Sequence, residues 1–136
     1  MILNTLLIAC AGLSMEVVFT AFHQRKKSGD WRLKGYTYVW MLPIYASVYP
    51  LFRLVYPRVA AWPLLARGAS YVGLIYAVEY ASGWALRAAT GECPWEREYR
   101  GARWSVHDLI RLDFAPAWLA AALIFERLCR ALPEAG

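Results

Sequence analysis

Four stretches of this chain are long and apolar enough for each to cross a lipid bilayer as a helix. A membrane-spanning helix needs about 20 consecutive residues that are mostly apolar. The sequence offers such stretches at residues 2–22, 36–56, 69–89 and 106–128. With 60% hydrophobic and 15% aromatic residues, the chain is also more apolar than an average soluble domain. We therefore expect an all-α polytopic membrane protein, with residues 1–136 forming one four-helix transmembrane bundle.

A faint internal repeat suggests how such a bundle is organised. Trp31 and Pro43 each have a counterpart of the same type 73 residues later, at Trp104 and Pro116. Each half of the chain would then hold a helix with an acid, a polar loop and a second helix with a proline. This pattern favours two tandem helical hairpins, with a kink in the second stretch at its prolines.

Three acids interrupt the apolar stretches: Glu16, Glu79 and Asp113. An ionised side chain at the centre of a bilayer costs roughly 2.5–3.5 kcal/mol on insertion scales, so such residues usually face a protein interior or a wet cavity. Loop topology places the acids in the half of the bundle nearest the first and third loops. We therefore predict one shared polar intramembrane site. The side chains expected to line it are Tyr36, Tyr38, Trp40, Arg87 and Arg111.

Several functions are compatible with such a site. Our leading hypothesis is a small-solute or ion transport component, or a permease-like accessory subunit. A first alternative is an integral-membrane enzyme that acts on a lipid or another amphiphile and uses a carboxylate as general acid or base. A second is a non-catalytic membrane scaffold in which Arg87 or Arg111 neutralises an acid and the polar cluster holds helices together.

The charge distribution points to a membrane rather than to nucleic acid. The formal charge is +5, but the basic residues sit between apolar blocks, as expected for groups that meet lipid head groups. The first and third loops carry nine Lys and Arg, and the opposite face carries five. The positive-inside rule therefore favours a cytoplasmic position for loops one and three. We expect a multi-pass protein of a bacterial inner membrane.

No motif in the sequence points to a metal or a cofactor. The three cysteines, Cys10, Cys93 and Cys129, form no CxxC pair and no disulfide framework. Residues 7–10 resemble a lipoprotein cleavage box, but the preceding residues lack a positive charge, so we expect a retained helix.

Two further patterns concern packing. Small residues recur every fourth position from Gly73 through Ala77 to Ala89, which lets another helix approach closely. Four short helices leave little room for a solute path, so we expect a homo-oligomer or another membrane subunit as partner. Glu126 and Arg130 have the spacing of a helical ion pair, which we interpret as solvated at the membrane interface.

The chain resembles a known family over nearly its whole length. The motifs are EVVFT at residues 16–20, GYTYVWMLPIY at 35–45, EYASG at 79–83, CPW at 93–95 and the segment 109–126. As a set they resemble the transmembrane protein 229 family. They resemble more distantly the bacterial membrane proteins grouped as type IV ABC-transporter proteins. The resemblance implies a small four-span membrane protein.

Overall fold

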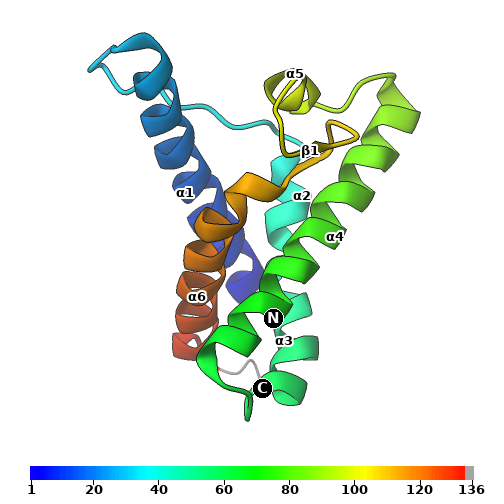
Figure 1. Ribbon diagram of the computed structural model, residues 1–136. Coiled ribbons are helices and arrows are strands. Elements are labelled where there is room, and N and C mark those ends of the chain that lie inside the picture. Colours follow the sequence, from blue (N-terminus) through cyan, green and yellow to red (C-terminus); the bar gives the residue numbers. More distant parts are fainter. Residues whose placement is uncertain (134–136) are drawn as a thin grey trace. The chain divides into compact units, whose positions relative to one another are not determined.

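The computed structural model describes residues 1–133, and these are mostly helical. In chain order the elements are α1 (Ile2–Ser28), α2 (Met41–Ala46), α3 (Val48–Val59), α4 (Leu64–Thr90), α5 (Glu96–Tyr99), β1 (Ser105–Val106), β2 (Ile110–Arg111), the 3₁₀ helix η1 (Leu112–Phe114) and α6 (Ala115–Ala131) (Figure 1). The chain forms two compact units. Unit 1 contains Met1–Arg53 and the residues from Leu132 onward, and unit 2 contains Leu54–Ala131.

Helix α1 is the element of unit 1 that best fits a membrane span. It has 27 residues, about 40 Å of helix. Of the helices in the described part of the chain, it alone is both long and apolar enough to qualify as a span by length and composition. It ends where Gly29 adopts a left-handed conformation with φ 71° and donates its N–H to the Arg25 carbonyl. Basic residues fill its last turn, where positive charge complements the helix dipole.

The second stretch differs from the continuous kinked helix that the sequence predicts. Its helix begins only at Met41, because Pro43 fits the first turn of a helix but not its interior. Residues 33–38 carry no regular secondary structure. Pro50 has no N–H to offer the Ala46 carbonyl, so the helix breaks at Ser47 into α2 and α3. Tyr36 and Tyr38 therefore lie in an extended segment and not in a helix.

Unit 2 is built on α4, which also has 27 residues and packs against α6. Gly68 makes this close packing possible, because a Cβ atom there would lie 2.5 Å from a methyl group of Leu119. Helix α4 ends at Gly91, which has φ 87° and donates its N–H to the Arg87 carbonyl. The small residues Gly73 and Ala77 are exposed, and the space around Gly73 is open.

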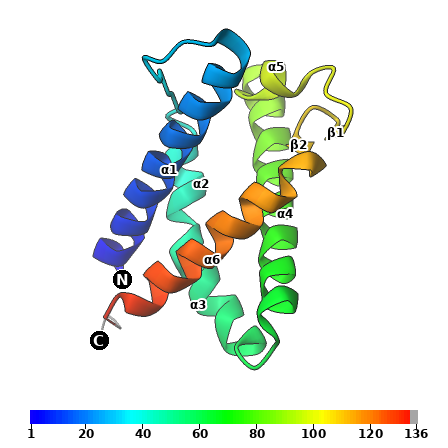
Figure 2. The ribbon, with the colours of Figure 1, turned by 60° about the vertical axis from the view of Figure 1, so that its left-hand side comes forward.

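The chain folds back beside α4 before α6 begins. Strands β1 and β2 form an antiparallel hairpin with Val106 opposite Ile110. His107 and Asp108 form its turn with φ 53° and 57°, a left-handed conformation that His and Asp adopt more readily than most residues. Both ribbon views place this hairpin next to the half of α4 that leads to α5 (Figures 1 and 2). Residues 106–114 are thus not part of the helix predicted for 106–128, which begins at Ala115 with Pro116 in its first turn.

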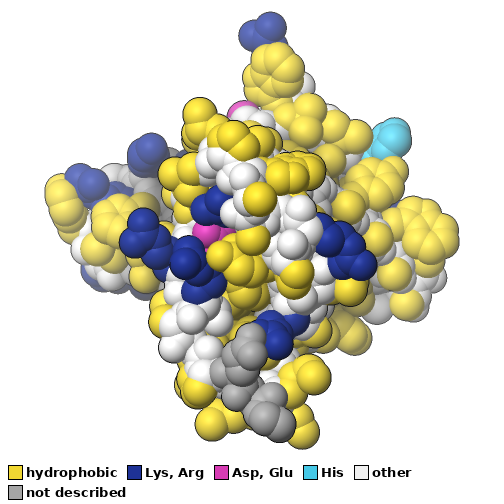
Figure 3. All heavy atoms as spheres, turned by 90° about the horizontal axis from the view of Figure 1, so that it is seen from below, with side chains coloured by type: hydrophobic (Ala, Val, Ile, Leu, Met, Phe, Trp, Pro, Cys, Tyr) yellow, Lys and Arg dark blue, Asp and Glu magenta, His cyan; other side chains and the backbone are white. Residues whose placement is uncertain are grey.

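Large hydrophobic side chains remain on the surface. Leu3, Leu6, Val18 and Phe22 of α1 are all exposed. Hydrophobic side chains also cover much of the face shown in Figure 3, with Lys and Arg side chains scattered among them. Apolar surface of this extent is unusual for a soluble monomer and is typical of contact with lipid or a membrane partner.

Candidate functional site

The most buried acid of the predicted site is Glu79, which lies near the middle of α4. Only 7% of the residue is exposed. Tyr99, the last residue of α5, is also buried and donates its hydroxyl to Glu79 Oε1 at 2.6 Å. Gly91 ends α4 and lets the chain turn back, so the sequence reaches Tyr99 on the same face of the helix. The result is a carboxyl group held by a phenol inside apolar packing.

Asp113 lies close to this pair but is more exposed. Arg111 donates from Nε to Asp113 Oδ1 at 3.1 Å, and its guanidinium carbon lies 4.1 Å from the centre of the Phe114 ring. The Tyr76 hydroxyl donates to the Arg111 carbonyl at 2.9 Å and lies within electrostatic range of both Glu79 and Asp113. The structure therefore brings two of the three predicted acids to one region of unit 2, together with Arg111.

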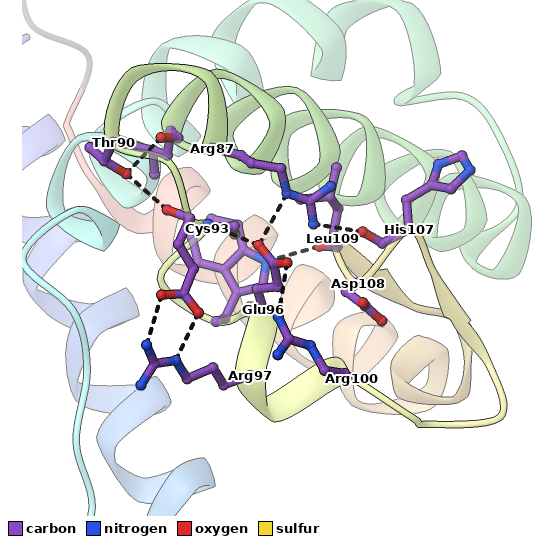
Figure 4. Close-up of polar contacts among 12 residues, drawn as sticks. Arg87, Thr90, Cys93, Glu96, Arg97, Arg100, His107, Asp108 and Leu109 are labelled. Carbon is purple, nitrogen blue, oxygen red and sulfur yellow. Dashed lines mark hydrogen bonds and ion pairs between the residues drawn. The ribbon is translucent and has the colours of Figure 1, made fainter.

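Arg87 pairs with Glu96, which is not one of the three acids of the predicted site. Its Nε donates to Glu96 Oε2 at 3.1 Å, and its NH2 group donates to the His107 carbonyl at 2.8 Å (Figure 4). The backbone N–H of Cys93 also donates to Glu96 Oε2. This N–H, followed by the Arg87 and Arg100 guanidinium groups, holds the pKa of Glu96 below its usual range despite some desolvation. Arg87 thus connects the end of α4 to residues 91–114, which fold back beside α4 and are called the fold-back segment below.

A small apolar core lies beneath this network. Cys93 and Leu109 are at most 1% exposed, and Trp95 donates its indole N–H to the Leu109 carbonyl at 2.9 Å. Gly83 of α4 faces them, since a Cβ atom there would lie 2.9 Å from Leu109 and 3.1 Å from Trp95. Burial raises the pKa of the Cys93 thiol to about 11. The CPW motif is therefore a packing element of the fold-back segment.

Glu16 lies in unit 1, at a place on α1 comparable to that of Glu79 on α4. The hydrogen-bonding side chains beside its carboxylate are those of Tyr45 and Thr37. Tyr45 approaches α1 at Gly12, where a Cβ atom would lie 2.3 Å from its ring. Gly35 touches the Val17 carbonyl in the same way. In unit 1, as in unit 2, a segment after the long helix returns to the level of a buried acid.

The predicted aromatic residues line this returning segment. Thr20 Oγ1 accepts a hydrogen bond from the Tyr36 N–H and donates one to the Tyr36 carbonyl, both at 2.9 Å. The Tyr36 and Tyr38 rings meet edge to face with centroids 5.9 Å apart. Trp40 precedes α2 and is half exposed. Since Glu16 belongs to one unit and Glu79 and Asp113 to the other, the single three-acid site stays a prediction.

Unit 2 also contains a buried ion pair that no sequence pattern predicts. Arg67 Nε and NH2 contact the two carboxylate oxygens of Glu126 at 2.6 and 2.9 Å. Only 5% of the Glu126 side chain is exposed, so it is not the solvated partner of Arg130 that the spacing suggests. Arg130 is the more distant partner, at 3.9 Å. Arg67 and Glu126 are 59 positions apart in the sequence, so no short-range pattern predicts their contact.

Comparison with known proteins gives the family of this chain. The model of the family described as "Putative ABC-transporter type IV" matches residues 3–135. The chain belongs to this family. No solved structure matches it. The name of the type IV ABC-transporter family suggests a transporter-related component with partner subunits in a membrane, which agrees with the apolar helix α1. Membership of the transmembrane protein 229 family stays a prediction.

Proposed function

We propose that this chain is a multi-pass membrane component of a transport system, and that Glu16, Glu79 and Asp113 supply its polar intramembrane site. Such a component would move a small solute or ion itself or act as a permease-like accessory subunit. The observation that carries the proposal is the Glu79–Tyr99 pair, a buried carboxyl group near the middle of a 27-residue helix. Ionisable groups at membrane depth usually mark solute or ion pathways.

The backbone around Glu79 supports this assignment. Tyr76 lies near the midpoint of α4. Its hydroxyl group is 2.9 Å from the Arg111 carbonyl oxygen and 3.2 Å from the Leu112 carbonyl oxygen, so the backbone of these two residues reaches the middle of α4. Irregular backbone at membrane depth is tolerated only where protein buries it or water lines it. If α4 crosses the membrane, the fold-back segment therefore enters the bilayer next to Glu79. Transporters commonly place their binding sites at such interruptions.

The scaffold remains a second candidate because several acids already have a basic partner. Asp113 pairs with Arg111, and Glu126 pairs with Arg67. Interhelical polar contacts such as Glu126–Arg67 contribute about 0.6 kcal/mol each on average to membrane-protein stability. The two candidates make different predictions for Glu79, because a scaffold needs its hydrogen bond and a transport site needs its proton or charge.

Flux measurements in liposomes separate these candidates. We would reconstitute the wild-type protein and the Glu79→Gln variant with trapped pH-sensitive and sodium-sensitive dyes. Gln keeps an oxygen that can accept the Tyr99 hydrogen bond, so the variant should fold while its flux falls to the level of protein-free vesicles. Asp30→Asn is the matched control, since Asp30 lies in an exposed loop and binds Arg32. Equal flux in the wild type and Glu79→Gln would contradict the transport proposal.

Cross-linking tests the shared site separately. Cysteines placed at Glu16 and Asp113, in a background without the three native cysteines, should form a cross-link with a short reagent in membranes. A cysteine at Asp30 paired with Asp113 serves as the comparison. Absence of the Glu16–Asp113 product would leave Glu79 and Asp113 as a two-acid site of unit 2 alone.

A further inference from the structure

Unlike Asp113 and Glu126, Glu16 has no basic partner among the described residues. Asp113 binds Arg111 and Glu126 binds Arg67. Within residues 1–133, the groups that act on the Glu16 carboxylate are the Tyr45 and Thr37 side chains, with no Lys or Arg among them. An ionised carboxylate removed from water is costly unless a positive charge compensates it. An ionised Glu16 would therefore need a positive charge from outside the described residues.

Two oxygen atoms at this place are buried and lack a hydrogen-bond partner in the described part of the chain. They are Glu16 Oε2 and Thr37 Oγ1. The carboxylate comes from α1 and the hydroxyl from the irregular segment 33–38, so the two elements meet at these oxygen atoms. Buried polar atoms without a partner are rare in folded proteins and call for a bound species. Tyr45 adds a third oxygen next to the same carboxylate.

The oxygen atoms at this place indicate which kind of ligand would bind there. Carboxylate, hydroxyl and carbonyl oxygens are ligands for hard cations. No group of three or more His, Cys, Asp or Glu in residues 1–133 could hold a metal ion, which argues against a divalent ion that needs several charged ligands. A single carboxylate balances one positive charge. Backbone that is not helical, such as residues 33–38, supplies carbonyl groups to sodium sites in transporters.

We propose that Glu16, Thr37 and Tyr45 form a binding site for a dehydrated monovalent cation such as sodium. This inference rests on the proposed transport function and names the ion at one of its acids. The cation replaces the missing basic side chain at Glu16. It also links α1 to segment 33–38, so its binding stabilises unit 1.

Thermal unfolding of the purified protein in detergent tests the site without any flux measurement. The Tm is followed while NaCl replaces choline chloride at constant ionic strength and pH. A ligand that binds only the folded state raises the Tm in a saturable way, and we expect a shift of about 4 °C at saturation.

Three variants assign the effect to these residues. Glu16→Gln should abolish the sodium-dependent shift, and Thr37→Val, which keeps the side-chain shape, should weaken it at least tenfold in sodium concentration. Asp30→Asn removes an acid of unit 1 outside the site and should respond as the wild type does.

A wild-type Tm that does not respond to sodium overturns the proposal, and so does an equal response in Glu16→Gln. In the first case a Glu16→Gln variant that is as stable as the wild type would identify a proton as the native occupant. The outcome is independent of the liposome experiment. A sodium shift without flux would refute transport and keep the site, and flux without a sodium shift would do the reverse.

Discussion

The guanidinium of Arg67 and the carboxylate of Glu126 form a two-pronged ion pair that joins α4 to α6 inside unit 2. Both contacts are shorter than 3 Å, and both side chains are largely buried. Bidentate pairs of this kind fix the orientation of the two helices as well as their distance. The pair is therefore the main polar link between the two longest helices of unit 2.

Removing one partner of this pair should destabilise the protein strongly. Glu126→Gln leaves the Arg67 charge uncompensated, so we expect a fall of many degrees in the Tm measured in detergent. Replacing both residues with Met removes the charge along with its partner and should restore most of the lost stability. A Glu126→Gln variant as stable as the wild type would show that the pair is exposed to water in solution.

The Tyr99 hydrogen bond should matter more than an exposed one. Tyr99→Phe deprives Glu79 Oε1 of its donor and should lower the free energy of unfolding by about 1–3 kcal/mol. Tyr80→Phe is the matched control, because the Tyr80 hydroxyl bonds His107 Nδ1 in an exposed position. Denaturant unfolding of both variants gives the comparison. Equal losses in the two variants would mean that Glu79 is not desolvated.

Two glycines of α4 with different surroundings, Gly73 and Gly83, should respond differently to the same substitution. Gly83→Val forces side-chain atoms into Leu109, Trp95 and Cys93, and we expect a loss of about 1–3 kcal/mol from overpacking. Gly73→Val meets open space and should leave the stability of the monomer close to that of the wild type. A loss of oligomer in Gly73→Val, seen by native mass spectrometry, would identify the small-residue face as the expected contact between copies.

Acid should weaken the fold-back segment through Glu96. The folded-state pKa of Glu96 lies below the ordinary value of 4.5, mainly because the Cys93 N–H and the Arg87 guanidinium favour the carboxylate. Its contribution to stability is therefore complete above pH 4.5 and is lost as the pH falls through the lowered pKa. The Tm of Glu96→Gln should be lower than that of the wild type at pH 7 and should change less between pH 5 and pH 3. Parallel Tm curves for the two proteins would rule out this role.

Cys93 should resist alkylation in the folded protein. Its pKa of about 11 leaves roughly one thiolate per thousand molecules at pH 8, and the residue is fully buried. In a variant that lacks Cys10 and Cys129, iodoacetamide labelling should be slow in the native state and fast in denaturant, as read by mass spectrometry. Rapid native labelling would indicate that the fold-back segment opens.

The long helices could be predicted from the sequence, but their short partners could not. The ranges 2–22 and 69–89 fall within α1 and α4, since long apolar runs read directly as helix. The helices in the other two ranges start later than expected. Pro43 and Pro116 both lie in a first helical turn, whereas a kink inside a longer helix was predicted at Pro43. The hairpin turn at His107 and Asp108 contains no glycine, so no sequence signal predicts it.

The acids of the proposed site stand out in the sequence, but their hydrogen-bond partners do not. Glu79 and Asp113 stand out because they interrupt apolar runs. Tyr99 lies in a polar loop, where nothing in the local pattern marks it as the residue that folds back onto Glu79. The same holds for Glu96, which binds Arg87 only because Gly91 reverses the chain. Contacts of this kind depend on tertiary structure and have no signature at short range.

The ion pair between Arg67 and Glu126 has a consequence for how the protein is made. Helix α1 is apolar enough to enter a bilayer alone, whereas α4 carries Arg67, Glu79 and Arg87 and is a poor substrate for insertion by itself. The partner that neutralises Arg67 is synthesised 59 residues later. If α4 and α6 cross the membrane as proposed, nascent α4 should wait beside the insertion machinery until α6 emerges, and the two helices should enter the lipid as a pair.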